Sequence, residues 1–516
     1  MKNVRWKMEN EKAANLYSVS SLSNPLTILT VCAAAGVSMA VLFDDSCQQD
    51  GGLHFLFAKW AWTHHELFIG VWSRPLFTLV YAFPALISYR AARLLTVLIC
   101  LAIGWQTWRL AKDLNIRNAS LSIVLLWLQP SFFLFCADNM TEQIFALVYL
   151  IALRLHHRGF VKTGMLIASL LVLSRPEGFF LGILWGIWVL SGPIRIPHSA
   201  SSIPLLVTGT FIWWSAALII TSDPLFIIHN WPSNWPVTGT IYGAAGLYAY
   251  PLRLPEIIGP LLLFPFFYGL FYLLKSRRLK TLTSTFLLIF ILHTIFRAFG
   301  LLGSAGYPRY LIAISPATAI ITLVGWNKIA DLFSHTSPLF RTVSAAIVII
   351  FSAYCNFIYA DGAEWSRDAA AVSEIHAWFL ANPQPVTRLI WSQSYSCILF
   401  ERDPWENISF TRDRETDLKL MRDSPAGTLA VWDERVGPKW SGIRAADFEE
   451  AGYRQLYHQS FNLRGFLLDR SWFGYGGPRQ QVIYLYYKPK TGNAKHAKKV
   501  LGVRCWVLGI LPTPNT

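Results

Sequence analysis

Charged residues are scarce in this chain of 516 residues, of which only 15% are Asp, Glu, Lys or Arg. Soluble globular domains carry about a quarter. Hydrophobic residues make up 53% of the chain. They gather in runs of about 14 to 20 residues, the length that membrane-spanning helices need. The shortage of charge therefore excludes an ordinary soluble domain and favours a polytopic membrane protein.

Signals for several other classes are missing as well. The seven cysteines are scattered without a CxxC pair or a Cys/His metal spacing, so the sequence predicts no metal site. Cys397 and Cys505 could pair if their region lies outside the cytoplasm. No A-x-A site follows the first apolar run, so we do not expect a cleavable signal. No internal repeat is found. This weakens the hypothesis of a transporter, because many transporters are built from duplicated halves.

Basic residues outnumber acidic ones by 45 to 30, giving a net charge of +15. In a membrane protein this excess is typical of cytoplasmic loops and of contacts with lipid phosphates, so we expect no nucleic-acid partner. The basic clusters at 109–117, 154–162 and 275–280 fall on the side of the N-terminus when about eleven spans are counted. This positive-inside pattern places residues 44–75 and 222–254 on the outer side.

The predicted fold is an all-α polytopic membrane protein with about eleven transmembrane helices and a C-terminal extracytoplasmic α/β domain. Residues 1–24 form a cytoplasmic N-terminus and residues 25–359 the transmembrane domain. Residues 76–88 are too short to cross and contain Pro84, which predicts an interfacial or re-entrant segment. The expected spans lie near 26–43, 91–108, 119–136, 140–155, 161–174, 179–192, 203–221, 255–274, 282–300, 308–325 and 340–358.

Residues 360–490 mix acidic, basic and aromatic residues, and we expect them to form the α/β domain. Residues 491–516 form a basic tail. The strand-like runs lie at 388–391, 428–432 and 481–487, and 448–457 is typical of a helix that leads into a strand.

The outer loop 44–75 holds the densest set of candidate functional residues. Asp44, Asp45 and Asp50 could accept a proton from an attacking hydroxyl group, and His54 and Arg74 could contact a substrate. The alternative is that the aspartates cap helices, because helix starts favour Asp.

Two further charged pairs adjoin expected spans. Asp138 and Glu142 open the span at 140–155, where they could bind substrate or cap the helix. Arg175 and Glu177 lie between two apolar runs, where ionisable groups are usually functional or paired with each other.

Three residues outside these pairs are candidates for substrate binding. Arg309, followed by Tyr310, leads into a late span, and its planar guanidinium suits phosphate, although it could instead reach lipid headgroups. His229 lies in the outer loop 222–254 and could pack against a sugar or a lipid chain.

In their order along the chain, these features resemble the GT-C superfamily of glycosyltransferases, which use polyprenyl-phosphate sugars. Within it the chain looks like a bacterial branch related to the protein mannosyltransferase and aminoarabinose transferase group. That pattern has two adjacent acids in the first outer loop, about eight residues before a small residue; Asp50 and Ala58 match this spacing, but Gly51 replaces the second acid. The resemblance implies that Asp50 is the catalytic base, with Asp44 or Asp45 as alternatives, and that Arg309 binds the carrier phosphate.

We therefore predict an inverting glycosyltransferase in a bacterial cytoplasmic membrane, with its site and C-terminal domain on the exterior. The donor is a lipid-linked sugar, the acceptor is a glycan, lipid or protein, and membrane lipids are further partners. No cofactor is required, but a diphosphate donor could need Mg²⁺ or Mn²⁺. The alternative from another class is a transporter or flippase of a lipid-linked glycan.

Overall fold

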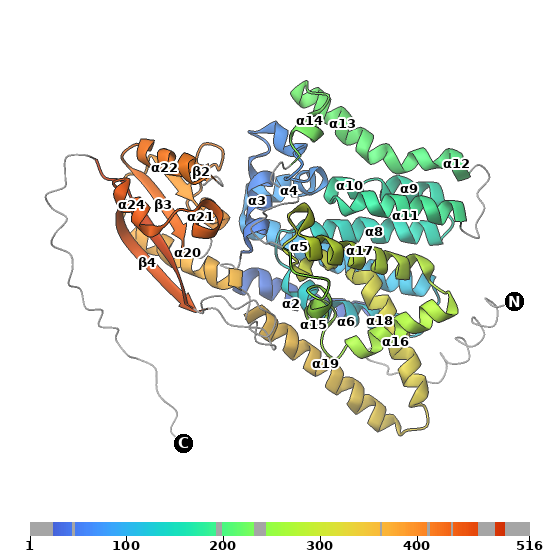
Figure 1. Cartoon of the computed structure of the whole chain (residues 1–516). Coiled ribbons are helices and arrows are strands. Elements are labelled where there is room, and N and C mark those ends of the chain that lie inside the picture. Colours follow the sequence, from blue (N-terminus) through green and yellow to red (C-terminus); the bar gives the residue numbers. More distant parts are fainter. Residues whose placement is uncertain are drawn as a thin grey trace, which may run out of the picture.

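The computed structural model describes residues 24–43, 47–191, 199–231, 244–361, 364–409, 413–434, 437–462 and 480–490. It has a helical part followed by a smaller part built on a β-sheet (Figure 1). The helix α3 lies on the side of the helical part that faces the sheet-bearing part (Figure 1).

The first half of the helical part begins with an Asn24 side chain that accepts a hydrogen bond from Leu26 N–H and caps α2. Its elements are α2 (Pro25–Leu42), α3 (Gln49–Trp60), η1 (His65–Phe68), α4 (Pro75–Ile87), α5 (Tyr89–Asp113), α6 (Leu121–Trp127), α7 (Pro130–Leu134), α8 (Thr141–His157), α9 (Val161–Ala168), α10 (Leu171–Ser174), α11 (Glu177–Ser191) and α12 (Ser199–Ser202).

The second half closes the helical part and leads toward the sheet through a long helix. Its elements are η2 (Ile203–Val207), α13 (Thr208–Thr221), α14 (Phe226–His229), η3 (Pro251–Arg253), α15 (Leu254–Ile258), α16 (Leu263–Ser276), α17 (Lys280–Phe299), η4 (Leu301–Gly303), η5 (Pro308–Ile314), α18 (Ser315–Leu332) and α19 (Pro338–Asp361).

Within the described ranges, six helices are long and apolar enough to cross a membrane, and a bent pair would make seven. The bent pair consists of Pro251–Ile258 and Leu263–Ser276, which differ in direction by 107°. These spans agree with the composition and make the chain an integral membrane protein. The six single helices are Pro25–Leu42, Tyr89–Asp113, Ile203–Thr221, Lys280–Phe299, Pro308–Leu332 and Pro338–Tyr359.

The number of long spans is thus smaller than the eleven expected, because proline and glycine interrupt several apolar runs. The run at 119–136 is divided into α6 and α7 just before Pro130, which lacks the N–H that a continuing helix needs. The run at 255–274 bends at Gly259, whose φ is 103°. The runs on either side of Pro176 form shorter apolar helices, Val161–Ser174 and Glu177–Ser191. Span counting from hydropathy alone treats these broken helices as straight ones.

The C-terminal part contains a five-stranded mixed sheet in the order β2-β1-β3-β5-β4, in which β2, β1 and β3 run parallel. The strands predicted at 388–391, 428–432 and 481–487 are confirmed, as is the helix that leads into a strand after residue 448. Its elements are α20 (Glu364–Ala381), β1 (Arg388–Trp391), α21 (Ser394–Leu399), β2 (Ile408–Ser409), α22 (Arg414–Asp423), β3 (Thr428–Asp433), α23 (Gly437–Ser441), α24 (Ala445–Glu450), β4 (Arg454–Asn462) and β5 (Gln480–Tyr487).

Alternation along the strands gives the sheet two apolar faces. Leu429 and Val431 belong to a large apolar core that also contains Phe55 of α3, so the core continues from the sheet into the helical part. Ala430 and Trp432 point to the other face, where they pack in a separate cluster with residues of α22 and α24. The C-terminal part is therefore joined to α3 by buried apolar surface.

Candidate active site

The helix α3 begins two residues before Gly51 and places Asp50 in its first turn. The Gln48 side-chain Oε1 accepts hydrogen bonds from Asp50 N–H at 2.7 Å and from Gly51 N–H at 3.1 Å, which caps the helix. A carboxylate in the first turn also interacts favourably with the helix dipole. The local sequence therefore holds the Asp50 side chain at a fixed end of α3.

Gly51 faces the loop between α7 and α8. A Cβ atom at this position would lie 2.4 Å from the Asp138 carboxylate Oδ1, which leaves no room for a side chain. This contact explains why glycine stands where the resembled family pattern has a second acid. In space, the carboxylate of Asp138 occupies the place beside Asp50 that a side chain of residue 51 would otherwise take.

Asp138 itself is almost fully buried, with 5% of its surface exposed. Its Oδ1 accepts a hydrogen bond from Asn139 N–H at 3.0 Å, and its Oδ2 makes no hydrogen bond to the described residues. Burial raises the pKa of Asp138 to about 6, although Arg93 and the Asn139 N–H act against this rise. The predicted capping of α8 by Asp138 is not observed, since the N-cap position is Met140.

Arg309 lies in η5 and reaches Asp50 through an ion pair between Nη2 and Oδ2. Its side chain is buried, and its Nε lies 3.7 Å from the Glu142 Oε1. The guanidinium also lies over the Tyr307 ring at 4.8 Å and over the Tyr310 ring at 5.5 Å. Its Nε and Nη1 make no hydrogen bond to the described part of the chain, so they retain donor capacity.

A second arginine completes a cluster of opposite charges. Arg175 Nη1 lies 2.7 Å from the Glu142 Oε1, and Arg175 Nη2 lies 2.6 Å from the Glu177 Oε1. The pairing of Arg175 with Glu177 was one of the two alternatives that the sequence left open, and it is observed. Glu142, which is 1% exposed, connects this pair to Arg309. Charges this deep in a helical membrane protein need such pairing.

His293 and Tyr250 lie beside the charge cluster, although the sequence does not predict them as site residues. His293 Nε2 lies 3.1 Å from the Glu177 Oε1, and its ring stacks against Tyr310 at 5.1 Å and Tyr250 at 5.9 Å. The available signal was an ionisable residue inside the apolar run at 282–300, a feature that often marks a functional position. Tyr250 gave no comparable signal.

His54 and Arg74 approach the cluster from the predicted outer loop. Burial lowers the pKa of His54 to about 3, and repulsion from Arg74, Arg309 and Arg175 adds to this effect against attraction from Asp50. His54 is therefore neutral at pH 7 and packs against the Phe77 ring at 5.2 Å.

Arg74 adopts a left-handed backbone conformation with φ 62°, which is strained for a residue with a side chain. Burial, followed by repulsion from Arg175, lowers its pKa to about 10, so it remains charged at pH 7.

Of the remaining predicted site residues, the structure describes only His229. His229 belongs to α14, where its Nδ1 lies 2.8 Å from the Asp223 Oδ2 at an exposed position. The structure does not bring His229 to the charge cluster. Asp44 and Asp45 lie outside the described residues, and so does Cys505, whereas Cys397 is a buried free thiol.

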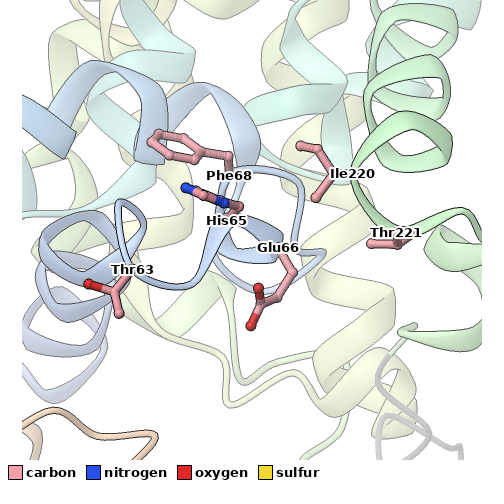
Figure 2. A pocket seen from close by; sticks show the side chains of 6 residues that line it. All are labelled: Thr63, His65, Glu66, Phe68, Ile220 and Thr221. Carbon is pink, nitrogen blue, oxygen red and sulfur yellow. The ribbon is translucent and has the colours of Figure 1, made fainter.

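A cleft of about 460 Å³ lies near η1 and the end of α13 (Figure 2). It is lined by side chains that present hydroxyl, imidazole and carboxylate groups beside apolar surface, namely Thr63, His65, Glu66, Phe68, Ile220 and Thr221. No residue of the charge cluster lines this cleft. The cluster carries the greater density of buried charge, and for that reason we place the candidate active site there.

The cluster offers two chemical functions. Its guanidinium groups can bind an anionic oxygen, and the partly exposed Asp50 carboxylate can accept a proton. Among the described residues, no group of three or more His, Cys, Asp or Glu side chains is arranged to hold a metal ion. The prediction that no cofactor is required stays a prediction.

No protein-family model and no curated protein matches the sequence. Among solved structures, the chain is similar to ArnT from Cupriavidus metallidurans, whose crystal structure is bound to undecaprenyl phosphate. The two share 12% sequence identity and superpose with a TM-score of 0.57, over 89% of this chain and 97% of that chain. The protein thus has an ArnT-like fold, with several membrane-spanning helices followed by a C-terminal mixed sheet.

Proposed function

We propose that this protein is a GT-C membrane glycosyltransferase that moves a sugar from a polyprenyl-phosphate carrier to an acceptor, with inversion at the anomeric carbon. The observation that carries this proposal is the direct contact between Asp50 and Arg309 at a buried cluster of charges. One partner can act as a base, and the other can bind phosphate. The similarity in fold to a protein whose structure is bound to undecaprenyl phosphate supports a polyprenyl-phosphate carrier.

The proposed reaction is a single displacement. The acceptor hydroxyl oxygen forms a bond to the anomeric carbon, while its proton passes to the Asp50 carboxylate. The bond between the anomeric carbon and the phosphate oxygen breaks, and its electron pair leaves on the lipid phosphate. Attack from the face opposite the leaving group inverts the configuration.

Arg309 would stabilise the negative charge that develops on the departing phosphate. Its Nη2 holds Asp50, so Nη1 and Nε are the donors that remain for phosphate oxygens. The Arg175 guanidinium is already bound by Glu142 and Glu177, and we assign it to holding those two carboxylates in place. A lipid monophosphate needs no divalent ion if arginine supplies the countercharge.

The distribution of basic loops supports a site on the extracytoplasmic side. The acceptor would be a glycan, a lipid or a protein, and the sequence favours none of the three. A transporter or flippase would move a lipid-linked glycan without breaking its glycosidic bond, and this difference separates the two functions experimentally.

The test is transfer by the purified full-length chain in liposomes that contain radiolabelled polyprenyl-phosphate hexoses or pentoses. We expect release of free polyprenyl phosphate and appearance of label in an acceptor from bacterial envelope extract, with inverted anomeric configuration. Movement of label across the bilayer with the glycosidic bond intact would instead support the transporter. A retained configuration would contradict the single displacement.

A further inference from the structure

The sheet-bearing part contacts α3 beside the candidate base. The loop that follows β1 lies at the carboxyl ends of the parallel strands β1 and β3, an edge where α/β sheets usually bind their ligands. Here that edge lies against α3, and the neighbouring helix α21 packs on α3 (Figure 1).

Two hydrogen bonds join this loop to Gln49, the residue directly before Asp50. Gln49 Nε2 donates to the Ser392 carbonyl oxygen at 2.9 Å, and Ser394 Oγ donates to the Gln49 carbonyl oxygen at 2.7 Å. The close approach of Ser394 to α3 also requires a glycine at position 52. A Cβ atom at position 52 would lie 2.5 Å from the Ser394 Oγ.

The loop is itself fixed to the sheet. Gln393 Nε2 donates to the Asp433 Oδ2 at 2.5 Å, and Asp433 N–H donates to the Ser392 Oγ at 3.0 Å. All of Ser394, Gln393 and Asp433 are buried, and Asp433 ends β3. The contact with Gln49 therefore comes from a rigid edge of the sheet and not from a free surface loop.

The other end of α3 is also held by the C-terminal part. His64 Nε2 lies 2.8 Å from the Asp403 Oδ2. The Trp405 ring lies 5.5 Å from the Phe57 ring and 5.3 Å from the His64 ring. Contacts at both ends fix α3 against sliding and rotation relative to the sheet.

We propose that the C-terminal part sets the position of the Asp50 carboxylate, and that Ser394 is the positioning residue through which it acts. This inference rests on the proposed function, because it takes Asp50 as the base. A displacement of a reacting group by about 1 Å can lower a rate by about a hundredfold. Loss of the Ser394 hydroxyl frees the Gln49 carbonyl at the start of α3 and lets the first turn move.

The test replaces Ser394 with alanine in the full-length protein. We expect S394A to lower kcat about tenfold with little change in the KM of the polyprenyl-phosphate sugar, because the base moves while the phosphate site stays. The matched control is S424A, which removes a buried hydroxyl that bonds Leu420 within the C-terminal part, and it should keep the wild-type kcat. Q49M removes the hydrogen bond that Gln49 Nε2 donates to the Ser392 carbonyl oxygen, and it should also lower kcat.

A disulfide tests the docking without an activity assay. A Cβ atom at position 52 would lie 3.3 Å from the Ser394 Cβ, just below the range of about 3.5–4.5 Å in disulfides, and S394C removes the Oγ that would otherwise lie 2.5 Å from it. The double variant G52C and S394C, with Cys47→Ala to remove the Sγ that would lie 2.8 Å from the new Cβ atom, should form this bridge on mild oxidation, detected by mass spectrometry. Failure to form it would overturn the docking.

The two proposals fail in different ways. A wild-type kcat in both S394A and Q49M, with sugar transfer intact in the wild-type chain, would overturn the positioning role alone. An absence of transfer by the wild-type chain would overturn the proposed function, and with it the role of Ser394, even if the disulfide forms.

Discussion

Two buried arginines in the helical part show how differently the same side chain can be used. Arg93 donates from Nε to the Ala137 carbonyl at 2.8 Å, from Nη1 to the Phe43 carbonyl at 2.7 Å, and from Nη2 to the Met39 carbonyl at 2.9 Å. Arg309 is equally buried, but its partners are the carboxylates of Asp50 and Glu142 and two aromatic rings. Arg93 thus donates hydrogen bonds to backbone carbonyl oxygens, whereas Arg309 takes part in a cluster of charged side chains.

This difference indicates which arginine can bind a ligand. Every nitrogen of the Arg93 guanidinium is committed to backbone oxygens at the end of α2 and in the loop before Asp138, so its role is structural. Arg309 keeps donors that the described residues do not use. In the sequence, Arg93 and Arg309 are both ionisable residues beside apolar runs. Only the groups that each guanidinium contacts in the structure distinguish their roles.

The sharpest way to test the comparison is Arg309→Ala. We expect kcat/KM for sugar transfer to fall, with a loss of about 2–4 kcal/mol in transition-state stabilisation, because the guanidinium stabilises negative charge on the leaving phosphate. Arg309→Lys keeps the charge but loses the planar fork, so it should be intermediate. Initial rates in one liposome preparation measure both. Wild-type values in the alanine variant would reduce Arg309 to a packing residue.

The converse test is Arg93→Met, which should affect stability instead of chemistry. Removing the guanidinium leaves three carbonyl oxygens short of a donor, and we expect the folded protein to lose about 3 kcal/mol. Thermal unfolding in detergent measures this loss, with the exposed neighbour Arg90→Met as the control. If Arg93→Met lowered kcat/KM per folded molecule as strongly as Arg309→Ala, the contrast between the two arginines would not hold.

A smaller effect is expected from His293→Phe. Phenylalanine keeps an aromatic ring between Tyr250 and Tyr310 but removes the Nε2 that lies near Glu177. Losing one interaction with a charged partner predicts a decrease in kcat/KM of about tenfold, or about 1.4 kcal/mol. Steady-state kinetics with the same donor measures it, and unchanged kinetics would make His293 a packing residue beside the cluster.

At neutral pH the smallest effect is expected at His54, because its contribution to the unfolding free energy appears only in acid. Its pKa of about 3 in the folded protein lies below the ordinary 6.5, so the unfolded chain binds the extra proton between these values. This proton leaves the free energy of unfolding unchanged above pH 6.5. Below pH 6.5 the free energy of unfolding falls toward pH 3, by up to about 1.4 kcal/mol per pH unit. In His54→Phe, the slope of unfolding free energy against pH below 6.5 should be shallower. Equal slopes would show that His54 takes up its proton without unfolding.

Much of this architecture follows from local sequence patterns. The strands at 388–391 and 481–487 are predicted almost to the residue, because short apolar and aromatic runs are typical of buried strands. The Arg175–Glu177 pair follows from its spacing at a helix break. Where eleven spans were expected, the described residues contain six long helices, one bent pair and three shorter apolar helices, since hydropathy does not register the breaks at Pro130, Pro176 and Gly259.

The candidate site was only partly predictable, because its contacts join distant segments. Asp50 and Arg309 are separated by 259 positions, and Ser394 lies 345 positions from Gln49. No local pattern indicates that Gly51 is required by the Asp138 carboxylate, although the two meet directly. The position of His229 was equally beyond local sequence patterns, since this histidine of the 222–254 loop pairs with Asp223 and does not contact the cluster.

Asp50→Asn tests most directly whether Asp50 is the base of a sugar transfer. The amide has nearly the same volume but cannot accept the proton, so transfer should fall by about 10²–10⁴-fold. Expression and binding of polyprenyl phosphate should remain. Asp44→Asn and Asp45→Asn, made in the same membrane preparation and assayed with the same lipid donor, should be milder. Transfer that survives in Asp50→Asn but is lost in Asp44→Asn or Asp45→Asn would contradict this assignment of the base.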